Sequence, residues 1–551
     1  MAERIVKVHV EKREHLVPVG TSVMALLGRL DAEGRPILGA VVNNRLVSLS
    51  TPIRGAAHIR AVTDLGREGS PIYRRSISIV LAQAVREVAP EGSLSIGQSL
   101  GEGYFFEWIG PAPITAAQIG LIEGRMRKII ADDRPFVEEE MDIHEAIELF
   151  KVEGALERVR LLKTLRVTTV PVVSLGGEHH LLHGPIAPAA GGLDRFELEI
   201  YNGGLILKFP GTERRQREVA DTPHLFKVYR DTRTWNEIIG ISDVGQFNEL
   251  CINDGVGEIV KVAEGLHEKK VAEIADRVLG REGCKLALIA GPSASGKTTF
   301  SKRLSIQLRV CGVRPMALSL DDYYVDREKT PRDADGSLDF EALEAIDLDL
   351  LNTHLEKLLK GERVDTPRFD FTAGKRSAPS EWRSLQLGKS DLLIVEGIHG
   401  LNERLTPAVP QQQKFRCYVS ALTQLKVDDH ERVFTSDSRL LRRMVRDRRY
   451  RGYTAARTID MWPAVRRGEQ VHIFPFQEQA DAIFNSALVY EPAVLKTYAE
   501  RFLLQVPTDS PAFVEADRLL RFLGLFVTVF PEEVPQTSIL REFIGGSSFA
   551  Y

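Results

Sequence analysis

The sequence predicts a multidomain chain in which small α+β units precede an α/β domain built on a parallel sheet. Its 551 residues are too many for one hydrophobic core and fit about three or four domains at roughly 150 residues each. Apolar and polar residues alternate over residues 4–10, as in a half-buried strand. An apolar run at 285–290, a glycine-rich loop and a helix-period segment at 299–308 then follow one another, as at the start of a parallel α/β unit.

The composition is that of an ordinary globular protein. Lys plus Arg total 72 and Asp plus Glu total 76, so the net charge of −4 argues against a general binder of nucleic acid or anionic membranes, although a local basic patch is allowed. The four cysteines lie far apart without a C-x-x-C spacing, so neither a zinc ribbon nor a disulfide framework is indicated. No apolar run approaches bilayer length, and the N-terminus lacks the apolar core of a signal peptide. We expect a cytoplasmic protein.

Residues 291–299 read Gly-Pro-Ser-Ala-Ser-Gly-Lys-Thr-Thr and fit the G-x-x-x-x-G-K-[ST] pattern of a phosphate-binding loop. The glycines let the backbone wrap round a phosphate, while successive N–H groups and a helix N-terminus face the anion. Lys297 would contact the outer phosphates, and the Thr298 hydroxyl would bind Mg²⁺. The alternative is a Gly/Ser loop that carries a lysine by chance. We predict ATP and Mg²⁺ as cofactors, with nucleotide contacts from Gly291, Ser293, Ser295, Gly296, Lys297, Thr298, Thr299 and Arg442.

Two acidic residues stand at the ends of predicted strands downstream of this loop. The strand at 316–320 leads into Asp321, at the edge where parallel sheets place their ligands. An ionised carboxylate there can accept the proton of an attacking hydroxyl, so we predict Asp321 as a general base; the alternative is an acidic helix cap. The buried strand at 392–396 ends in Glu396, which we predict to hold Mg²⁺ together with Thr298.

A basic helix is predicted over residues 439–452. It carries four arginines on one face, at i, i+3, i+4 and i+7, namely Arg439, Arg442, Arg443 and Arg446. Three interpretations remain open: a lid that closes over a triphosphate, a contact with nucleic acid, or a solvated basic helix. Its position downstream of the loop and of Glu396 favours the lid.

Taken in order, these features resemble the uridine kinase and phosphoribulokinase family over about residues 283–490. The resemblance rests on the loop, Asp321-Asp-Tyr-Tyr324, Phe369-Asp-Phe371, Glu396-Gly397 and an R-R-x-x-R-D-x-x-x-R-G pattern. It implies an ATP-dependent kinase that acts on an alcohol, with the 5′-hydroxyl of a nucleoside as the favoured acceptor. The implied catalytic residues are Lys297, Asp321 and Arg446, and the implied acceptor-binding residues are Tyr324, Asp339, Phe369, Phe371, Arg443 and Arg451.

The sequence departs from this family where the base is recognised. The family's base-reading Tyr, His, Arg and Gln correspond here to Phe369, Gly374, Tyr453 and Met461. A site without placed hydrogen-bonding groups discriminates poorly among bases. The acceptor is therefore either a broad range of nucleosides or another hydroxylated metabolite such as a sugar phosphate. An RNA-binding or regulatory ATPase is a further alternative.

The N-terminal half resembles threonyl-tRNA synthetases. The element order of residues 1–65 is similar to their β-grasp TGS domain, and residues 66–240 are similar to the adjoining editing domain, with a helix at 74–88 and a hairpin that turns at Asn202-Gly203. This resemblance implies tRNA or another regulator as a partner; an interaction or spacer module is the alternative. We expect connecting helices at 241–282 and a helical extension at 491–551, whose tail docks on the kinase domain or on a partner subunit of a homo-oligomer.

The editing family's metal positions have changed in this chain. They carry Arg75, Ile79, Leu182 and Ile186, which cannot hold Zn²⁺. The nearby His179, His180 and His183 lie in a glycine-rich stretch, and we expect them to be solvated loop residues, with a metal site as the alternative. We expect neither bound zinc nor deacylase activity.

Overall fold

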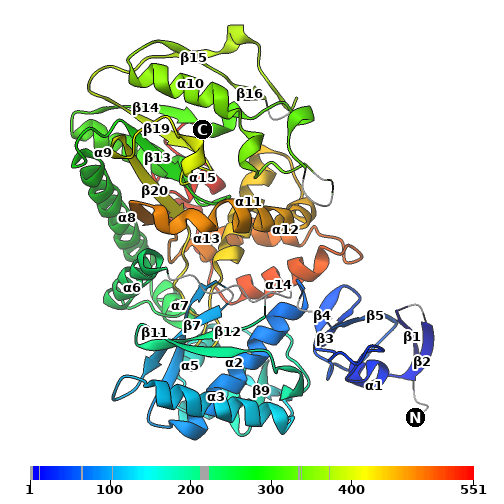
Figure 1. Ribbon diagram of the computed structural model, residues 1–551. Coiled ribbons are helices and arrows are strands. Elements are labelled where there is room, and N and C mark those ends of the chain that lie inside the picture. Colours follow the sequence, from blue (N-terminus) through cyan, green and yellow to red (C-terminus); the bar gives the residue numbers. More distant parts are fainter. Residues whose placement is uncertain are drawn as a thin grey trace.

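A computed structural model describes residues 4–11, 13–63, 66–101, 103–210, 222–332, 336, 338–370 and 373–551. Phe371, one of the predicted acceptor-binding residues, lies outside the described residues, and so does residue 65, the predicted end of the first domain. Figure 1 shows the N-terminal unit in dark blue at one side, the second unit in lighter blue and cyan, and the C-terminal domain in green to red above it. The predicted mixture of α+β and parallel α/β architecture is confirmed.

The N-terminal unit is a five-stranded sheet with one short helix. The sheet order is β2-β1-β5-β3-β4, with strands Arg13–Pro18, Ile5–Val10, Ala57–Val62, Gly39–Val42 and Arg45–Val47. Helix α1 (Val23–Leu27) begins after Ser22, whose Oγ accepts a hydrogen bond from the Ala25 N–H at 3.2 Å. Asn43 and Asn44 turn the β3–β4 hairpin with φ angles of 48° and 57°, which the asparagine side chain tolerates.

The second unit packs helices against two antiparallel sheets. Its four-stranded sheet runs β11-β12-β7-β6, with strands Glu197–Tyr201, Gly204–Lys208, Gly103–Ile109 and Ser93–Leu100. Its three-stranded sheet runs β10-β9-β8, with strands Glu178–Leu181, Thr169–Leu175 and Val137–Asp142. The helices are α2 (Gly69–Val88), α3 (Ala116–Ala131), α4 (Ile143–Val152) and α5 (Leu156–Thr164). The hairpin turn predicted at Asn202 and Gly203 joins β11 to β12.

Three helices connect this unit to the C-terminal domain: α6 (Pro223–Ile238), α7 (Val244–Ile252) and α8 (Val256–Leu279). These three helices lie within the range 222–282, most of it predicted as connecting helices. An apolar stripe of α8 is buried, with Val271, Ile274 and Val278 at most 5% exposed, and Ile259 and Val260 continue this buried face toward the start of the helix.

The C-terminal domain is built on a parallel five-stranded sheet of order β14-β19-β13-β20-β21. These strands are Arg314–Ser319, Asp391–Glu396, Leu286–Ala290, Lys414–Ser420 and Ala482–Asn485. Helices α9 (Lys297–Val310), α10 (Leu348–Leu359), α11 (Thr435–Tyr450) and α12 (Ala455–His472) accompany the sheet. Every residue of the central strand β13 is buried, as expected of a parallel sheet covered on both faces.

Shorter elements complete the domain. The small antiparallel pairs are β15 (Val364–Thr366) with β18 (Arg383–Leu385) and β16 (Phe369–Asp370) with β17 (Lys375–Arg376). The predicted C-terminal helices are α13 (Glu491–Leu503) and α14 (Phe513–Gly524), and a short α15 (Arg541–Ile544) follows. Within the described ranges, no helix combines the length and the apolar character needed to cross a bilayer.

Candidate active site

The phosphate loop joins the end of β13 to the start of α9, as predicted. A Cβ atom at Gly291 would lie 2.0 Å from the Val419 carbonyl oxygen, and one at Gly296 would lie 2.5 Å from Cγ2 of Ile539. Gly296 also has φ 85° and precedes the first residue of α9. Glycine is therefore required at both places, and the helix N-terminus opens onto the loop. Ser293, Ser295, Lys297, Thr298 and Thr299 all lie on this turn.

Glu396 meets Thr298 across the edge of the sheet. The Thr298 Oγ1 hydroxyl donates to Glu396 Oε1 at 2.6 Å, which places a hydroxyl and a carboxylate together at the end of β19. Burial raises the pKa of Glu396 to about 7, and burial lowers the pKa of Lys297, whose Nζ donates to the Pro292 carbonyl at 3.0 Å. Oxygen ligands of this kind suit Mg²⁺, so the donor set fits the predicted cation.

Asp321 lies on the same edge, in a short 3₁₀ turn (Leu320–Tyr323) after β14. The side chain of Ser319, not that of Asp321, caps this turn, because its Oγ accepts from the Asp321 N–H at 3.3 Å. Asp321 remains accessible from solvent. Partial desolvation by the protein around it raises the pKa of its carboxyl, and the positive charges of Lys297 and Arg451 lower it. The helix-cap alternative is therefore wrong, and the carboxylate is open to an incoming hydroxyl.

The predicted acceptor residues gather beside Asp321. The Tyr324 hydroxyl donates to the Phe340 carbonyl at 3.1 Å, and its ring lies 5.8 Å from that of Phe369. Asp339 Oδ2 is 3.4 Å from Nε2 of His472 on α12. The structure adds one carboxyl that the sequence did not single out: burial raises the pKa of Glu341 to about 7, and the charge of Glu469 acts in the same direction while those of Arg443 and Lys297 oppose it. No sequence motif marks Glu341, because these neighbours are brought to it by the fold.

The arginines of α11 support the loop rather than form a solvated face. Arg439 donates to the Ser293 carbonyl at 3.0 Å and pairs with Glu469, and Arg443 donates to the Ser293 hydroxyl at 2.8 Å. Arg439 is only 1% exposed, so the solvated-helix interpretation is wrong. Arg446 and Arg451 pair with the buried Asp447 at 3.0 and 3.4 Å.

Arg442 requires a correction to the predicted nucleotide contacts. Its side chain is 0% exposed, and its guanidinium donates twice to Glu491 and once to the Ser486 carbonyl. Its contact with the phosphate loop is a hydrogen bond from Nη1 to the Ala294 backbone carbonyl at 3.4 Å. A guanidinium committed to a buried carboxylate is not available to a phosphate. Arg442 therefore holds the loop in place from inside the domain.

Comparison with known proteins agrees with this geometry. Residues 287–490 match the model of the Phosphoribulokinase / Uridine kinase family. This match lies within the C-terminal domain. Solved structures similar to parts of the kinase chain include a possible uridine kinase from Bacillus stearothermophilus, with TM-score 0.28, 19% identity and coverage of 39% of this chain and 97% of that chain. Another is a D-glycerate 3-kinase from Cryptococcus neoformans, with TM-score 0.20, 16% identity and coverage of 46% and 86%.

The half of the chain that precedes the kinase domain matches threonine–tRNA ligases. The enzyme of Desulforamulus reducens is 29% identical over 233 residues, which cover 40% of this chain and 36% of the ligase. The enzyme of Aquifex aeolicus is 29% identical over 231 residues, which cover 41% and 34%. The chain thus spans about a third of the length of these curated relatives, and the predicted resemblance of the N-terminal half is confirmed.

The C-terminal tail docks on the kinase domain of its own chain. Glu542 on α15 accepts hydrogen bonds from the Thr299 N–H at 3.2 Å and from its hydroxyl at 2.8 Å, and the Tyr551 hydroxyl lies 2.7 Å from the same Thr299 oxygen. Ile539 packs against Gly296. Of the two docking places that the sequence left open for the tail, the structure shows the kinase domain. A carboxylate therefore stands at the first turn of α9, beside the loop that faces phosphate.

This carboxylate leads to a prediction about nucleotide affinity. We expect Glu542→Gln to strengthen ADP binding by roughly three- to tenfold, because it removes a negative charge from the N-terminal end of α9. Isothermal titration calorimetry of the full-length protein with Mg²⁺–ADP measures the change. Glu532→Gln, at an exposed acid on the same tail, serves as the control and should leave the affinity unchanged. Unchanged or weaker binding by Glu542→Gln would contradict the prediction.

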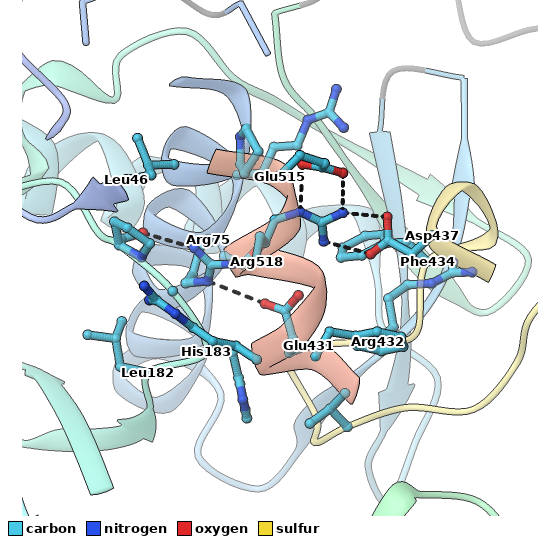
Figure 2. A pocket seen from close by; sticks show the side chains of 18 of the residues that line it. Leu46, Arg75, Leu182, His183, Glu431, Arg432, Phe434, Asp437, Glu515 and Arg518 are labelled. Carbon is cyan, nitrogen blue, oxygen red and sulfur yellow. Dashed lines mark hydrogen bonds and ion pairs between the residues drawn. The ribbon is translucent and has the colours of Figure 1, made fainter. Parts of the chain in front are cut away.

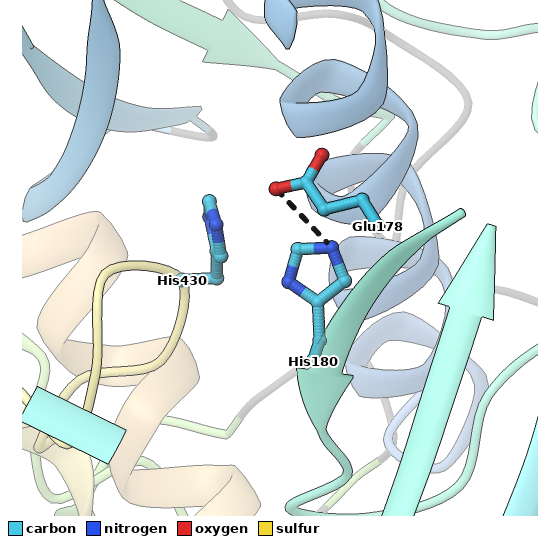
Figure 3. Close-up of side chains that lie close together, drawn as sticks. All are labelled: Glu178, His180 and His430. Carbon is cyan, nitrogen blue, oxygen red and sulfur yellow. Dashed lines mark ion pairs between the residues drawn. The ribbon is translucent and has the colours of Figure 1, made fainter. Parts of the chain in front are cut away.

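His180 of the second unit is buried, which corrects the expectation that it is a solvated loop residue. It lies on β10 at 2% exposure, and Figure 3 shows its ring facing Glu178 and His430. The ligand atoms of these three residues lie within 4.8 Å of one another, a spacing that could hold a metal ion. His179 and His183 are also paired, with Glu153 at 2.7 Å and Asp428 at 3.0 Å. The sequence missed this burial because the segment around His430 is remote in the chain.

The guanidinium of Arg158 disfavours a metal ion between Glu178, His180 and His430. Its Nη2 lies 3.3 Å from Nδ1 of His180, and because a guanidinium can only donate, Nδ1 must accept. Burial lowers the pKa of His180 and lowers that of His430 to about 4, so both rings are neutral near pH 7. The single ring proton of His180 then sits on Nε2, 3.7 Å from Glu178 Oε1, where a metal would have to bind.

We therefore expect the purified protein to contain no stoichiometric zinc. Elemental analysis by inductively coupled plasma mass spectrometry measures the metal content of the full-length chain. The variants His180→Ala and His430→Ala should not change it, and His144→Ala, at an exposed position, is the matched control. One zinc ion per chain that disappears in the first two variants but not in the control would show that the expectation is wrong.

Proposed function

We propose that the chain is an ATP- and Mg²⁺-dependent kinase that phosphorylates a hydroxyl of a small molecule. One observation carries the proposal: three neighbouring parallel strands deliver the phosphate loop, Glu396 and Asp321 to the same edge of one sheet. The charges of Lys297, Asp321 and Glu396 act on one another's pKa, as expected of side chains that face a common space. The family match of residues 287–490 supports the same chemistry.

The residues divide the work as follows. Asp321 orients the acceptor hydroxyl and accepts its proton, and Lys297 places a positive charge beside the outer phosphates. Thr298 and Glu396 would hold Mg²⁺, while Arg443, Arg446 and Arg451 line the acceptor side. When bound, ATP supplies the phosphoryl group and Mg²⁺ neutralises its charge. The acceptor we propose first is the 5′-hydroxyl of a nucleoside, with Asp339 bound to ribose hydroxyls and Tyr324 and Phe369 beside the base.

A second acceptor class is favoured by a residue next to Gly374. A Cβ atom at Gly374 would lie 2.7 Å from Cζ of Arg327, so an arginine fills the place where the resembling family reads a base. A guanidinium recognises phosphate better than a neutral base edge. The second candidate is therefore a sugar phosphate that carries a free hydroxyl.

A panel of nucleosides and sugar phosphates, assayed for ADP release by the full-length protein, separates the two candidates. Phosphorylation of nucleosides alone supports the first. Phosphorylation of sugar phosphates alone, with a higher KM in Arg327→Gln, supports the second. If no hydroxylated metabolite accelerates ADP release, the kinase proposal itself fails. For the N-terminal half we propose tRNA as the partner, tested by a gel shift that weakens steeply with salt.

The buried carboxyls predict how stability depends on pH. The pKa values of Glu341 and Glu396 rise from an ordinary 4.5 to about 7, mainly through burial. Such a shift favours the folded state at low pH, and this stabilisation is lost as the pH rises through about 7. Burial lowers the pKa values of four histidines, which act in the opposite direction over the same range: His180, His267, His399 and His430. The effect of a single carboxyl is therefore measured as a difference between two proteins. The unfolding midpoint of the metal-free wild type should fall by about 2 °C relative to that of Glu341→Gln between about pH 6 and pH 8.

Differential scanning fluorimetry measures this midpoint. Addition of Mg²⁺ at the higher pH should raise the wild-type midpoint, because a cation compensates these carboxylates. The difference should arise because Glu341→Gln lacks one of the buried carboxyls whose pKa is raised, whereas Glu157, another such carboxyl, is present in both proteins. A midpoint that depends on pH identically in wild type and variant would contradict the expectation.

A further inference from the structure

A large cavity lies where the N-terminal unit, the second unit and the kinase domain meet. Its volume is about 680 Å³, within the range of small-molecule sites. Residues from β4, α2, α12 and α14 line it, together with the segment 427–437 that precedes and begins α11. Figure 2 shows side chains from different parts of the chain around this space, among them the guanidinium groups of Arg75, Arg432 and Arg518.

Most of the acidic groups in the cavity already have partners. Arg518 bridges Asp437 and Glu515, with distances of 2.7 Å to each, and Arg75 pairs with Glu431 at 3.4 Å. Figure 2 marks these contacts with dashed lines. They neutralise the carboxylates of Asp437, Glu515 and Glu431. Two further acids, Glu138 and Glu140, also line the cavity, and Glu138 accepts a hydrogen bond from the Ser50 hydroxyl at 2.7 Å.

Two further guanidiniums line the cavity. Arg432 is 6% exposed. Its guanidinium donates to the backbone carbonyls of Gly97 at 2.6 Å and Thr423 at 3.0 Å. Arg74 lies over the rings of Tyr104 and Phe209, at 5.8 and 4.6 Å from their centroids. Neither forms an ion pair with a carboxylate in the described part of the chain. Arg432 is buried and Arg74 is half-buried. A cation withdrawn from water without a counterion is unfavourable, so the pair indicates a place for an anion.

Neighbouring groups complete an anion subsite. The Tyr104 ring lies 5.9 Å from that of Phe434, and Arg432 lies over Phe434 at 5.9 Å, so each arginine lies over one ring of this neighbouring pair. Ser78 lines the cavity at 2% exposure, and its hydroxyl has no hydrogen-bond partner among the residues that the structure describes. An orphaned buried hydroxyl next to guanidiniums is a donor for an oxyanion.

We propose that this cavity binds a phosphate-bearing small molecule. Arg74, Arg432 and Ser78 contact the phosphate oxygens, and Tyr104 and Phe434 contact the rest of the ligand. The walls come from separate parts of the chain and enclose a volume suited to a metabolite, which favours a small phosphate ester over the backbone of an RNA.

The cavity is also connected to the phosphate loop. Trp462 and Arg466 of α12 line it, and Arg466 donates to Glu469 Oε2 at 3.3 Å. The other oxygen of Glu469 accepts from the Ser293 N–H of the loop at 3.1 Å. The bound ligand therefore regulates the kinase domain through α12, and this regulatory step rests on the proposed kinase function.

The binding test uses full-length Lys297→Ala, in which the phosphate loop has lost its lysine. Isothermal titration calorimetry with inorganic phosphate, nucleoside monophosphates and hexose phosphates should find a probe that binds. Arg74→Gln and Ser78→Ala, added to this background, should weaken that binding by roughly tenfold each, as expected for charge-assisted and buried hydrogen bonds. Arg45→Gln is the matched control: this arginine also lies over a ring, that of Phe513, but outside the cavity, and it should change nothing.

Three outcomes would overturn the binding proposal: no phosphorylated probe binds, binding is indifferent to Arg74 and Ser78, or only tRNA binds. A second arm measures ADP release by the wild type. The probe that binds should change the rate by severalfold in wild type and not in Arg74→Gln, whose basal rate should equal that of wild type. Binding without any change in rate would overturn the regulatory step alone. The binding proposal would still be judged by calorimetry, and the kinase proposal by the substrate panel.

Discussion

Replacing Lys297 by alanine is expected to reduce ADP release by at least about a hundredfold, because one preorganised charge beside the transferred phosphoryl group is lost. Burial lowers the pKa of Lys297, and the charges of Glu396 and Asp321 act on it in the opposite direction, so the ammonium is close enough to both carboxylates to interact with them. The Lys297 Nζ donates to the Pro292 carbonyl, a contact within the same loop, so the fold should persist without this side chain.

A coupled assay of ADP release measures the effect of Lys297→Ala, and circular dichroism checks the fold. Lys285→Ala is the matched control: this lysine precedes the same strand at the opposite end, where it is half-buried and its Nζ donates to the Lys389 carbonyl. Its rate should equal that of wild type. Near-full turnover by Lys297→Ala would mean that the loop does not hold the reacting phosphates.

Replacing Asp321 by asparagine is expected to lower kcat by roughly two to four orders of magnitude, the usual contribution of a general base. An amide keeps the size of the side chain but cannot take the proton of the acceptor hydroxyl. The pH profile should change as well, because the acidic limb that reports the Asp321 carboxyl should disappear from the variant.

Asp322→Asn is the control for Asp321→Asn. The Asp322 carboxylate accepts from the Phe369 N–H at 3.3 Å, so it positions the acceptor side of the site and does not face the phosphate loop. We expect its main effect in KM for the acceptor. If Asp321→Asn keeps more than about a tenth of wild-type kcat, the assignment of the general base is wrong.

The parts of the site that depend on short sequence patterns could be predicted. The phosphate loop, Asp321 and Glu396 each stand directly after a strand, and parallel strands bring their carboxyl ends to one edge without further information. Lys297, Thr298 and Glu396 meet for this reason, although 98 residues separate Thr298 from its hydrogen-bond acceptor.

The errors arose where a side chain's environment is set by a remote partner. The basic pattern of α11 gave no sign that Arg442 would be buried against Glu491, 49 residues later. His180 was expected in solvent because its covering residue, His430, belongs to the kinase domain. Glu341 was missed because a carboxylate acquires a raised pKa from its surroundings and not from its neighbours in sequence.

The tail contact has a consequence for the order of events during protein synthesis. Thr299 and Glu542 are 243 residues apart, so a growing chain exposes the phosphate loop well before α15 has been translated. At that stage the N-terminal end of α9 faces solvent without its carboxylate neighbour, and the loop is at its most receptive to anions. A nucleotide that binds the nascent domain would favour the folded over the unfolded chain by mass action. Cellular ATP would then assist folding of this domain before the tail completes it.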